Sequence, residues 1–316
     1  MQKRMLGESG IETGPLVFGG NVFGWTINEA QSFRMLDAWL TGGFNMVDTA
    51  DVYSTWGPGN RGGESETIIG KWMKQRGNRG RVIVATKVGK PMGPDKKGLS
   101  AKYMRQALED SLRRLQTDYI DLYQSHDDDP ATPMEETMEA FASFIREGKV
   151  RAVGASNFSA DRLKKSLEVS DRFGYPRYVS LQPKYNLYER ADFERELEPL
   201  CVAEGLGVIS YYALASGFLT GKYRSEQDLS KSARGQGNKK FLTERGFRIL
   251  TALDEVANKY HSSPAAVSIA WLIARPSVTA PIASATNTDQ LQELVAAASL
   301  QLDSEAMGKL GKASEY

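Results

Sequence analysis

Residues 82–123 read VIVATKVGKPMGPDKKGLSAKYMRQALEDSLRRLQTDYIDLY, and this stretch decides the fold. It begins with a short β-branched run, VIVATK, and ends with a second apolar run, YIDLY. Between them Ser100 is a candidate helix N-cap, and apolar residues then recur at helical spacing as far as Leu115. The stretch is therefore predicted to form a strand, a helix and a second strand, which is the repeating unit of a parallel sheet.

The same alternation of short apolar runs and helical patterns extends along the whole chain. Ser159 and the pair Ser263-Pro264 carry further helix-start signals. The candidate strands are Pro15–Gly19, Phe44–Thr49, Val82–Lys87, Tyr119–Tyr123, Arg151–Ser156, Tyr178–Gln182, Gly207–Tyr212 and Val278–Ala283. Eight such units in 316 residues predict an α/β fold of the closed (β/α)8 TIM-barrel type rather than an open doubly wound sheet.

Two segments depart from this alternation. Met5–Thr13 precedes the first strand and is predicted to be a short N-terminal hairpin that closes the bottom of the barrel. Gly217 to about Arg245 lies between strand seven and strand eight, and its polar, Gly-rich part predicts a long surface loop, a kind of segment that often carries function. No linker or low-complexity tract interrupts the chain, so residues 1–316 are expected to form a single domain.

The composition argues against some classes of binding partner. Forty basic residues against 39 acidic residues leave a net charge of +1, which gives no electrostatic reason to expect nucleic acid or an anionic membrane. No run approaches the ~18 apolar residues of a membrane span, and no secretory signal opens the chain, so a cytoplasmic location is expected. Cys201, the single cysteine, excludes an intramolecular disulfide and is interpreted as inert packing.

Titratable residues follow three neighbouring predicted strands at their carboxyl ends, where the active sites of such barrels gather. They are Asp48, Tyr53, Lys87 and His126. A phenol has a pKa near ~10, and a buried ammonium beside it favours the phenolate and lowers that pKa. Asp48 would keep Lys87 charged, and a neutral His126 would orient a carbonyl oxygen towards Tyr53. Proton donation to a carbonyl oxygen is half of a reduction, and a hydride must supply the other half.

Several segments match one family in order along the chain. GFNMVDTADVY, followed by GGESETIIG, resembles the aldo-keto reductase signature around its active-site Asp and Tyr. The resemblance continues through TKVG, LYQSHDDD, VGASNFS, SLQPKYNLY, SYYALASGFLTGKY and APIASATNTDQLQEL, and so covers essentially the whole chain. Length and loop pattern resemble the longer branch, which includes bacterial reductases and potassium-channel β subunits.

The resemblance implies roles for these positions. Tyr53 would be the general acid, Asp48 and Lys87 its activators, and His126 the carbonyl-orienting residue. The implied cofactor contacts run from the nicotinamide to the adenosine end: Asn21, Asp48, Ser156, Asn157, Gln182, Tyr211, Ser216, Leu219, Lys222, Arg234, Ser284, Thr286, Gln290 and Glu293. A helix predicted to start near Thr288 would offer free N–H groups to a 2′-phosphate.

Two departures from the family pattern concern the cofactor. The aldose-reductase branch has Lys and Arg at the positions of Ser284 and Gln290, and Leu294 replaces an Asn that usually touches the adenine. NADP(H) is favoured as the cofactor, and NAD(H) stays an alternative. The predicted activity is reduction of an aldehyde or ketone, or the reverse oxidation of a secondary alcohol. The partner is then a small molecule, and the sequence leaves its identity, the direction and the oligomeric state open.

Other interpretations of the same residues are weaker. Lys87 as a Schiff-base lysine would leave Asp48 and Tyr53 unexplained. The run Asp127-Asp128-Asp129 is interpreted as a solvated loop rim, and no metal site is expected. Residues 57–62 spell the dinucleotide fingerprint without the strand it requires, and they are interpreted as a loop beside the substrate pocket. Trp25, Trp56 and Asp127 are candidate walls of that pocket.

A second hypothesis concerns a different class of function. The channel-associated relatives suggest a cofactor-sensing regulatory subunit with little turnover. The signature begins almost at Met1, without an N-terminal inactivation segment, and this weakens the regulatory interpretation.

Overall fold

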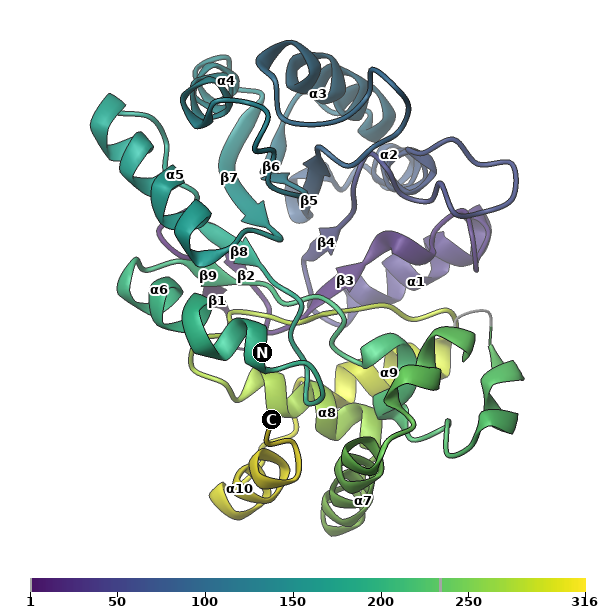
Figure 1. Cartoon of the computed structure of the whole chain (residues 1–316). Coiled ribbons are helices and arrows are strands. Elements are labelled where there is room, and N and C mark those ends of the chain that lie inside the picture. Colours follow the sequence, from purple (N-terminus) through teal and green to yellow (C-terminus); the bar gives the residue numbers. More distant parts are fainter. Residues whose placement is uncertain (1, 233–234) are drawn as a thin grey trace.

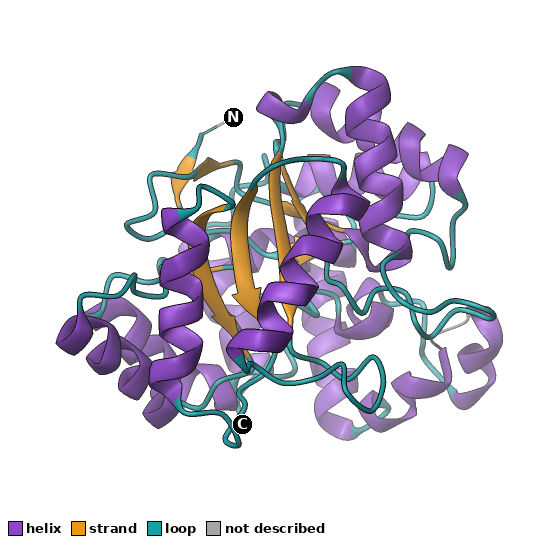
Figure 2. Cartoon of the chain, turned by 90° about the horizontal axis from the view of Figure 1, so that it is seen from above, coloured by secondary structure: helices purple, strands orange, loops and turns teal. Residues whose placement is uncertain are grey.

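The computed structural model describes residues 2–232 and 235–316 of the chain. Strands occupy its centre and helices surround them (Figures 1 and 2). In spatial order the strands are β10 (Ile282–Ala283), β3 (Val17–Gly19), β4 (Met46–Asp48), β5 (Ile83–Val88), β6 (Ile120–Ser125), β7 (Val150–Ser156), β8 (Ser180–Gln182) and β9 (Gly207–Val208). Each neighbouring pair in this order is parallel.

Backbone hydrogen bonds also join the two ends of this sheet. The N–H of Thr279 donates to the carbonyl of Val208 at 2.8 Å, and the N–H of Ile282 donates to that of Ser210 at 2.7 Å. The segments of β9 and β10 therefore meet, and the sheet closes. The predicted (β/α)8 barrel is confirmed, and all eight predicted strands are present, although several are shorter than their apolar runs.

The helices connect the strands on the outside of the barrel (Figure 1). They are α1 (Glu29–Thr41), α2 (Glu64–Arg76), α3 (Ala101–Leu115), α4 (Met134–Arg146), α5 (Ala160–Phe173), α6 (Glu198–Ala203), α7 (Glu244–Lys259), α8 (Pro264–Ile273), α9 (Thr288–Ala297) and α10 (Ser304–Ala313). Shorter helical segments are the 3-10 helices η1 (Gly20–Val22) and η2 (Arg79–Arg81) and the π-helix η3 (Phe193–Leu197). Ser100, Ser159 and Ser263 each accept a hydrogen bond from a first-turn N–H, so the predicted N-caps are confirmed.

The inward-facing side chains of the strands change from apolar to polar along the barrel axis. At the amino ends they are apolar, and Met46, Ala85 and Leu122 belong to a fully buried interior cluster. Two residues further along the same strands come Asp48 and Lys87, both buried. Because side chains alternate across a strand, each polar residue faces the same interior as the apolar residue before it. The fold thus places polar groups in a layer at the carboxyl ends of the strands.

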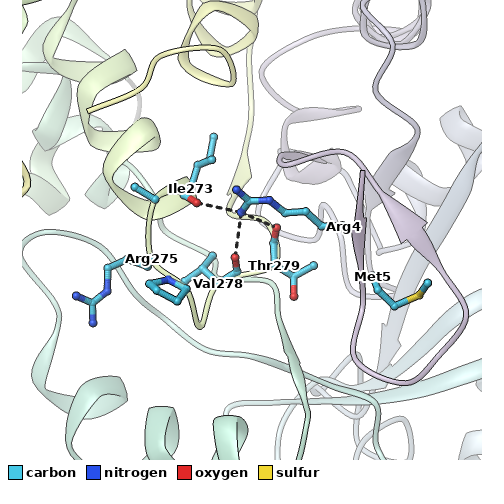
Figure 3. Close-up of a pocket in the computed structure, with 8 residues that line it drawn as sticks. Arg4, Met5, Ile273, Arg275, Val278 and Thr279 are labelled. Carbon is cyan, nitrogen blue, oxygen red and sulfur yellow. Dashed lines mark hydrogen bonds between the residues drawn. The ribbon is translucent and has the colours of Figure 1, made fainter. Parts of the chain in front are cut away.

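The opposite end of the barrel is closed by the predicted hairpin, β1 (Arg4–Met5) and β2 (Glu12–Thr13), which are antiparallel. Arg4 fixes the hairpin, since its Nη1 donates to the carbonyls of Ile273, Val278 and Thr279 at 3.0, 3.2 and 3.3 Å (Figure 3). These carbonyls lie at the end of α8 and just before β10. The pocket drawn in Figure 3 is therefore at the end of the barrel away from the polar layer.

The long segment between β9 and β10 was predicted to be a surface loop, but its described residues contain regular structure. It contains the short 3-10 helices η4 (Ala215–Thr220), η5 (Glu226–Lys231) and η6 (Gly235–Phe241). Leu229 and Phe241 are buried, so the segment packs on the barrel as well as facing solvent. Cys201 is also buried, which raises the pKa of its thiol to about 12 and agrees with a packing role. Within the described residues, no helix has the length and apolar character needed to cross a membrane.

Candidate active site

The four titratable residues selected from the sequence come together in the polar layer. Lys87 Nζ lies 2.7 Å from Asp48 Oδ2 and 3.3 Å from the hydroxyl oxygen of Tyr53. The rings of Tyr53 and His126 are 5.9 Å apart between centroids. A lysine ammonium, its carboxylate partner, a phenol and an imidazole thus form one cluster at the carboxyl ends of β4, β5 and β6.

Lys87 holds its charge although its side chain is fully buried. Burial alone would lower the pKa of Lys87, but the Asp48 carboxylate, the Tyr53 oxygen and the hydrogen bonds to both outweigh it and raise the pKa above its usual value. The carbonyl of Thr49 accepts a third hydrogen bond from the ammonium, at 2.8 Å. A buried charge with three such partners meets the condition under which an ion pair is tolerated inside a protein.

His126 is neutral. Burial, and then the positive charges of Lys87 and Lys90, lower the pKa of its imidazole well below the usual range. Its Nδ1 is buried and has no hydrogen-bond partner among the described residues. A proton on Nδ1 would make it a buried donor without an acceptor, so the geometry favours the tautomer with the proton on Nε2.

Two glutamines hold the other oxygen of Asp48. Gln182 Nε2 donates to Asp48 Oδ1 at 2.9 Å, and Gln124 Nε2 approaches the same oxygen at 3.5 Å. Gln124 was missed from the sequence although it directly follows the predicted strand Tyr119–Tyr123, because only titratable residues were selected at the strand ends. Strand alternation could have found it, because Gln124 precedes His126 by two residues and follows the inward-facing Leu122 by two.

Three further predicted residues adjoin this cluster. Asn157 Nδ2 donates to the carbonyl of His126 at 2.8 Å, and the hydroxyl of Tyr211 donates to Asn157 Oδ1 at 2.7 Å. Ser156 Oγ donates to the carbonyl of Gln182 at 2.9 Å. The residues that were expected to hold a carboxamide and to stack on a ring are therefore linked by hydrogen bonds to the backbone of His126 and Gln182.

The turn at η4 has the features of an anion site. Ala215, Ser216 and Gly217 have φ values of 46°, 56° and 92°, which turn the backbone sharply. Lys222 Nζ lies 3.4 Å from the point where a Cβ on Gly217 would stand, so an ammonium lies against this turn. Backbone turns of this kind combined with a cation suit a pyrophosphate. The side chain of Leu219 is buried in the core, and Arg234 lies outside the described residues.

The residues expected at the adenosine end lie around the end of β10 and the start of α9. Ser284 Oγ is 2.7 Å from the last carbonyl of β3 and 2.6 Å from Asn21 Oδ1. Gln290 Oε1 accepts from the N–H and the hydroxyl of Thr286 at 2.9 and 3.0 Å. Glu293 is half-buried on α9. Gln290 and Thr286 therefore form hydrogen bonds with each other, and the Ser284 hydroxyl forms one with the backbone of β3.

Aromatic rings form a wall beside Tyr53. The ring of Trp56 lies 5.3 Å from that of Tyr53 and 5.9 Å from that of Trp25, both in edge-on arrangements. Trp56 is exposed. The two tryptophans therefore extend from the phenol to the surface, as expected for the wall of a substrate pocket.

The loop at residues 57–62 follows turns rather than a strand, which agrees with rejecting it as a dinucleotide fingerprint. Asn60 Nδ2 donates to the carbonyls of Gly24 and Ser54, both at 2.9 Å. The Glu64 carboxylate accepts from the N–H groups of residues 54, 61 and 62. The loop is thus fastened beside the tryptophans.

The carboxylates of Asp127, Asp128 and Asp129 do not converge. Their partners are, in order, Lys90 (3.0 Å), Arg162 (2.7 Å) and the N–H of Leu99 (2.8 Å). No group of three His, Cys, Asp or Glu side chains able to hold a metal occurs among residues 2–232 and 235–316.

Known proteins resemble this chain over almost its whole length. The chain is similar to an uncharacterized oxidoreductase YrpG of Bacillus subtilis (strain 168), 36% identical over 317 residues that cover 98% of this chain and 95% of that protein. It is also similar to a probable voltage-gated potassium channel subunit beta of Oryza sativa subsp. japonica, 34% identical over 93% of this chain and 90% of that protein. An L-glyceraldehyde 3-phosphate reductase of Escherichia coli O157:H7 is 33% identical over 94% of this chain and 87% of that protein.

A family model described as the aldo/keto reductase family matches residues 15–315, which is almost the whole chain. The barrel and the cluster at its carboxyl end lie within the matched residues. On these grounds the chain belongs to the aldo/keto reductase family of oxidoreductases.

Proposed function

We propose that this protein is an NADP(H)-dependent oxidoreductase that reduces an aldehyde or ketone to an alcohol, or oxidises a secondary alcohol in reverse. The observation that supports this most directly is the position of Lys87 Nζ, 3.3 Å from the Tyr53 hydroxyl and 2.7 Å from Asp48. An ammonium held in place by a carboxylate stabilises the negative charge that develops on the phenol oxygen as its proton leaves.

In this proposal Tyr53 donates the proton to the carbonyl oxygen. The neutral His126, with its proton on Nε2, donates a hydrogen bond to the same oxygen and fixes the direction of the carbonyl. Lys87 acts through Tyr53, and Asp48 holds Lys87. The buried layer around these groups limits the entry of water, which strengthens each charge interaction.

The residues of the chain fit a nicotinamide dinucleotide. Ser156, Asn157 and Gln182 present amide and hydroxyl groups beside the cluster, Tyr211 presents a ring, and the left-handed turn with Lys222 suits a pyrophosphate. When bound, the nicotinamide would supply the hydride for the carbonyl carbon. The remaining proposed contacts are Asn21, Asp48, Ser216, Leu219, Arg234, Ser284, Thr286, Gln290 and Glu293, with NADP(H) favoured over NAD(H).

Replacing the proposed acid tests this function. Tyr53→Phe removes the transferable proton, so we expect turnover of aldehydes and ketones to fall roughly a thousandfold, within the range for loss of a general acid. Binding of NADPH and NADH, measured separately by fluorescence titration, should stay within about twofold because Tyr53 is not among the proposed cofactor contacts. Tyr175→Phe, away from the cluster, serves as the control. Near-normal turnover in Tyr53→Phe would remove this residue from its proposed role.

The rice relative described as a potassium channel β subunit favours a second candidate, a cofactor-sensing regulatory subunit. This candidate predicts tight NADPH binding with very slow turnover on any carbonyl compound. Steady-state turnover over a panel of aldehydes, ketones and secondary alcohols, with both cofactors, separates the two candidates.

A further inference from the structure

The carboxyl end of α10 is bound by arginines from the start of α7. Arg245 Nε and Nη2 donate to the carbonyls of Glu315 and Ser314 at 2.9 and 2.8 Å. Arg248, one turn further along α7, donates to the carbonyl of Ala313 at 2.9 Å. The last carbonyls of a helix lack partners inside the helix and lie at its negative end, so cationic donors suit this position. The first turn of α7 is therefore fastened to the end of α10.

Arg245 also stacks on Tyr188, which lies in the segment after β8. Its Cζ is 4.7 Å from the centroid of the Tyr188 ring, within the range of a cation–π contact. The Tyr188 hydroxyl oxygen is 3.1 Å from Oγ1 of Thr243, the residue that caps α7. Asn186 Oδ1 accepts from the N–H of Tyr188 at 2.8 Å. The ring, the hydroxyl and the backbone of Tyr188 are thus each held by a separate contact.

Tyr188 packs in turn against the η4 turn. Its ring centroid lies 6.2 Å from that of Phe218 and 4.8 Å from that of Phe241, edge-on in both cases. Phe218 directly follows Gly217 in η4, and its side chain is fully buried. A Cβ on Gly246, in the first turn of α7, would stand 3.0 Å from a ring carbon of Phe218, so α7 packs closely on the same ring. Because close-packed interiors transmit displacements, a shift of Tyr188 or α7 reaches the turn.

The backbone of this turn needs support from its surroundings. Ala215 and Ser216 are not glycines, yet their φ values are 46° and 56°. Residues with a Cβ adopt such angles at a cost in free energy, and they keep them only where neighbouring contacts hold them. Asn186 adds one such contact, since its Nδ2 donates to the carbonyl of Tyr212 at 3.0 Å, shortly before the turn. The segment that carries Tyr188 therefore supports the turn through both backbone and ring contacts.

We propose that Arg245 and Tyr188 are positioning residues that hold the η4 turn in the form that binds a pyrophosphate. The proposal rests on the proposed function, since the turn is taken to bind the pyrophosphate of a nicotinamide dinucleotide. Neither residue belongs to the cluster around Tyr53. Loss of either one therefore weakens cofactor binding and leaves the proton transfer intact.

Hydrogen–deuterium exchange of the protein without cofactor tests the support directly. In Arg245→Met the amides of residues 215–221 should exchange at least roughly tenfold faster than in the native protein, because the turn opens more often once Tyr188 loses its cation. The amides of residues 83–88 in β5 should keep their native rates. Tyr188→Leu, which removes the ring, is the second variant and should show the same local increase.

Cofactor binding and kinetics test the consequence. Arg245→Met should raise the Kd and the KM for NADPH roughly tenfold, a change on the order of one lost contact of this kind. The KM for the carbonyl compound, kcat at saturating NADPH and the pH dependence of kcat should stay near the native values. Arg245→Lys keeps a cation over the Tyr188 ring, so it should recover most of the NADPH affinity.

Arg248→Met is the matched control. Arg248 binds the same end of α10, and within the described part of the chain no cation–π contact joins it to Tyr188. This variant should keep the NADPH affinity within about twofold, because only a helix-end hydrogen bond is lost. It should also keep the native exchange rates at residues 215–221.

Two results overturn the inference. One is native exchange at residues 215–221 in both Arg245→Met and Tyr188→Leu. The other is an NADPH affinity in Arg245→Met no weaker than in Arg248→Met. If the native protein binds neither NADPH nor NADH, the proposed function fails, and the exchange experiment still decides whether Arg245 and Tyr188 hold the turn.

Discussion

Asp48 and Asp51 stand three residues apart, and only 2% and 1% of their surfaces are exposed. Their surroundings differ completely. Asp48 binds Lys87 Nζ at 2.7 Å and Gln182 Nε2 at 2.9 Å. Neither carboxyl oxygen of Asp51 has a side-chain hydrogen-bond partner among the described residues, and the backbone N–H of Val52 acts on the carboxyl. Burial, and then the charge of Glu66, raise the pKa of Asp51 to about 8.

The arginine nearest to Asp51 is already engaged. Arg114 Nε binds Glu66 Oε2 at 2.7 Å, and Thr86 Oγ1 binds the other oxygen of Glu66 at 2.5 Å. Asp51 therefore faces a second carboxylate rather than a free cation, and it keeps its proton at neutral pH. The comparison teaches that burial alone does not make a reactive carboxylate here. Partners decide whether a buried carboxyl is a fixed charge or a neutral acid.

The largest effect is expected when the paired carboxylate loses its cation. Lys87→Met leaves Asp48 charged and buried with only glutamine donors, so we expect a loss of about 3–5 kcal/mol in the free energy of unfolding. Turnover should also fall by roughly a thousandfold or more, because the phenol loses its ammonium. Urea unfolding and steady-state kinetics measure the two losses.

The double variant Asp48→Asn/Lys87→Met sharpens this result. Removing both charges should recover much of the stability and none of the turnover. Lys184→Met is the control for loss of the partly exposed Lys184–Glu189 pair, with an expected cost of about 1 kcal/mol or less. If Lys87→Met loses no more stability than Lys184→Met, the ion pair with Lys87 does not explain why Asp48 and Asp51 differ.

An effect of opposite sign, on stability and not on turnover, is expected at Asp51. The unfolded chain releases this proton near pH ~3.9, whereas the folded protein releases it near pH 8. The contribution of Asp51 to stability therefore falls as pH rises between these values, by at most about 1.4 kcal/mol per pH unit. Asp51→Asn removes this titration, so it should gain stability relative to the native protein as the pH is raised from 5 to 8.

Urea unfolding at three pH values in this range measures that gain. Asp118→Asn, at an exposed position, is the control and should change the pH dependence little. Turnover of Asp51→Asn at pH 7 should stay close to that of the native protein, because Asp51 is already neutral there. An identical pH slope in Asp51→Asn and the native protein would contradict the neutral state of this carboxyl.

The smallest effect concerns the weaker of the two glutamine contacts to Asp48. Gln124→Met removes a donor at 3.5 Å, whereas Gln182→Met removes one at 2.9 Å. Hydrogen bonds weaken steeply with length, so Gln124→Met should lower turnover less than about tenfold and less than Gln182→Met does. The reverse ranking in kcat would show that distance does not order the partners of Asp48.

Features set by local sequence were predicted correctly. The carboxyl ends of the predicted strands placed Asp48 and Lys87 at one end of the barrel, and the caps at Ser100, Ser159 and Ser263 marked helix starts. Both predictions depend on neighbours within a few residues. The roles of the site residues stay predictions. The structure shows that some of these residues lie close together. For example, Lys87 Nζ is 3.3 Å from the Tyr53 hydroxyl oxygen.

Features set by distant neighbours were not predictable in this way. The sequence of residues 48–51, DTAD, gives no sign that one carboxyl gains Lys87 and the other meets Glu66. The burial of Phe241 was not predicted, because the sequence around it is polar. This burial depends on packing against Tyr188, with 4.8 Å between the ring centroids. The lengths of β3, β4, β8, β9 and β10 were overestimated because only part of each apolar run finds a ladder partner, whereas β6 and β7 are each one residue longer than predicted.

The closure of the sheet has a consequence for how the chain can fold. The last strand, β10, lies beside the first barrel strand, β3, and Arg4 binds carbonyls 269–275 residues away. Until the segment at 279–283 is in place, β3 and β9 present unpaired edges, which invite pairing with other chains. Maturation of the barrel thus depends on its final strand, and truncation before β10 should yield an aggregating fragment rather than a smaller, working barrel.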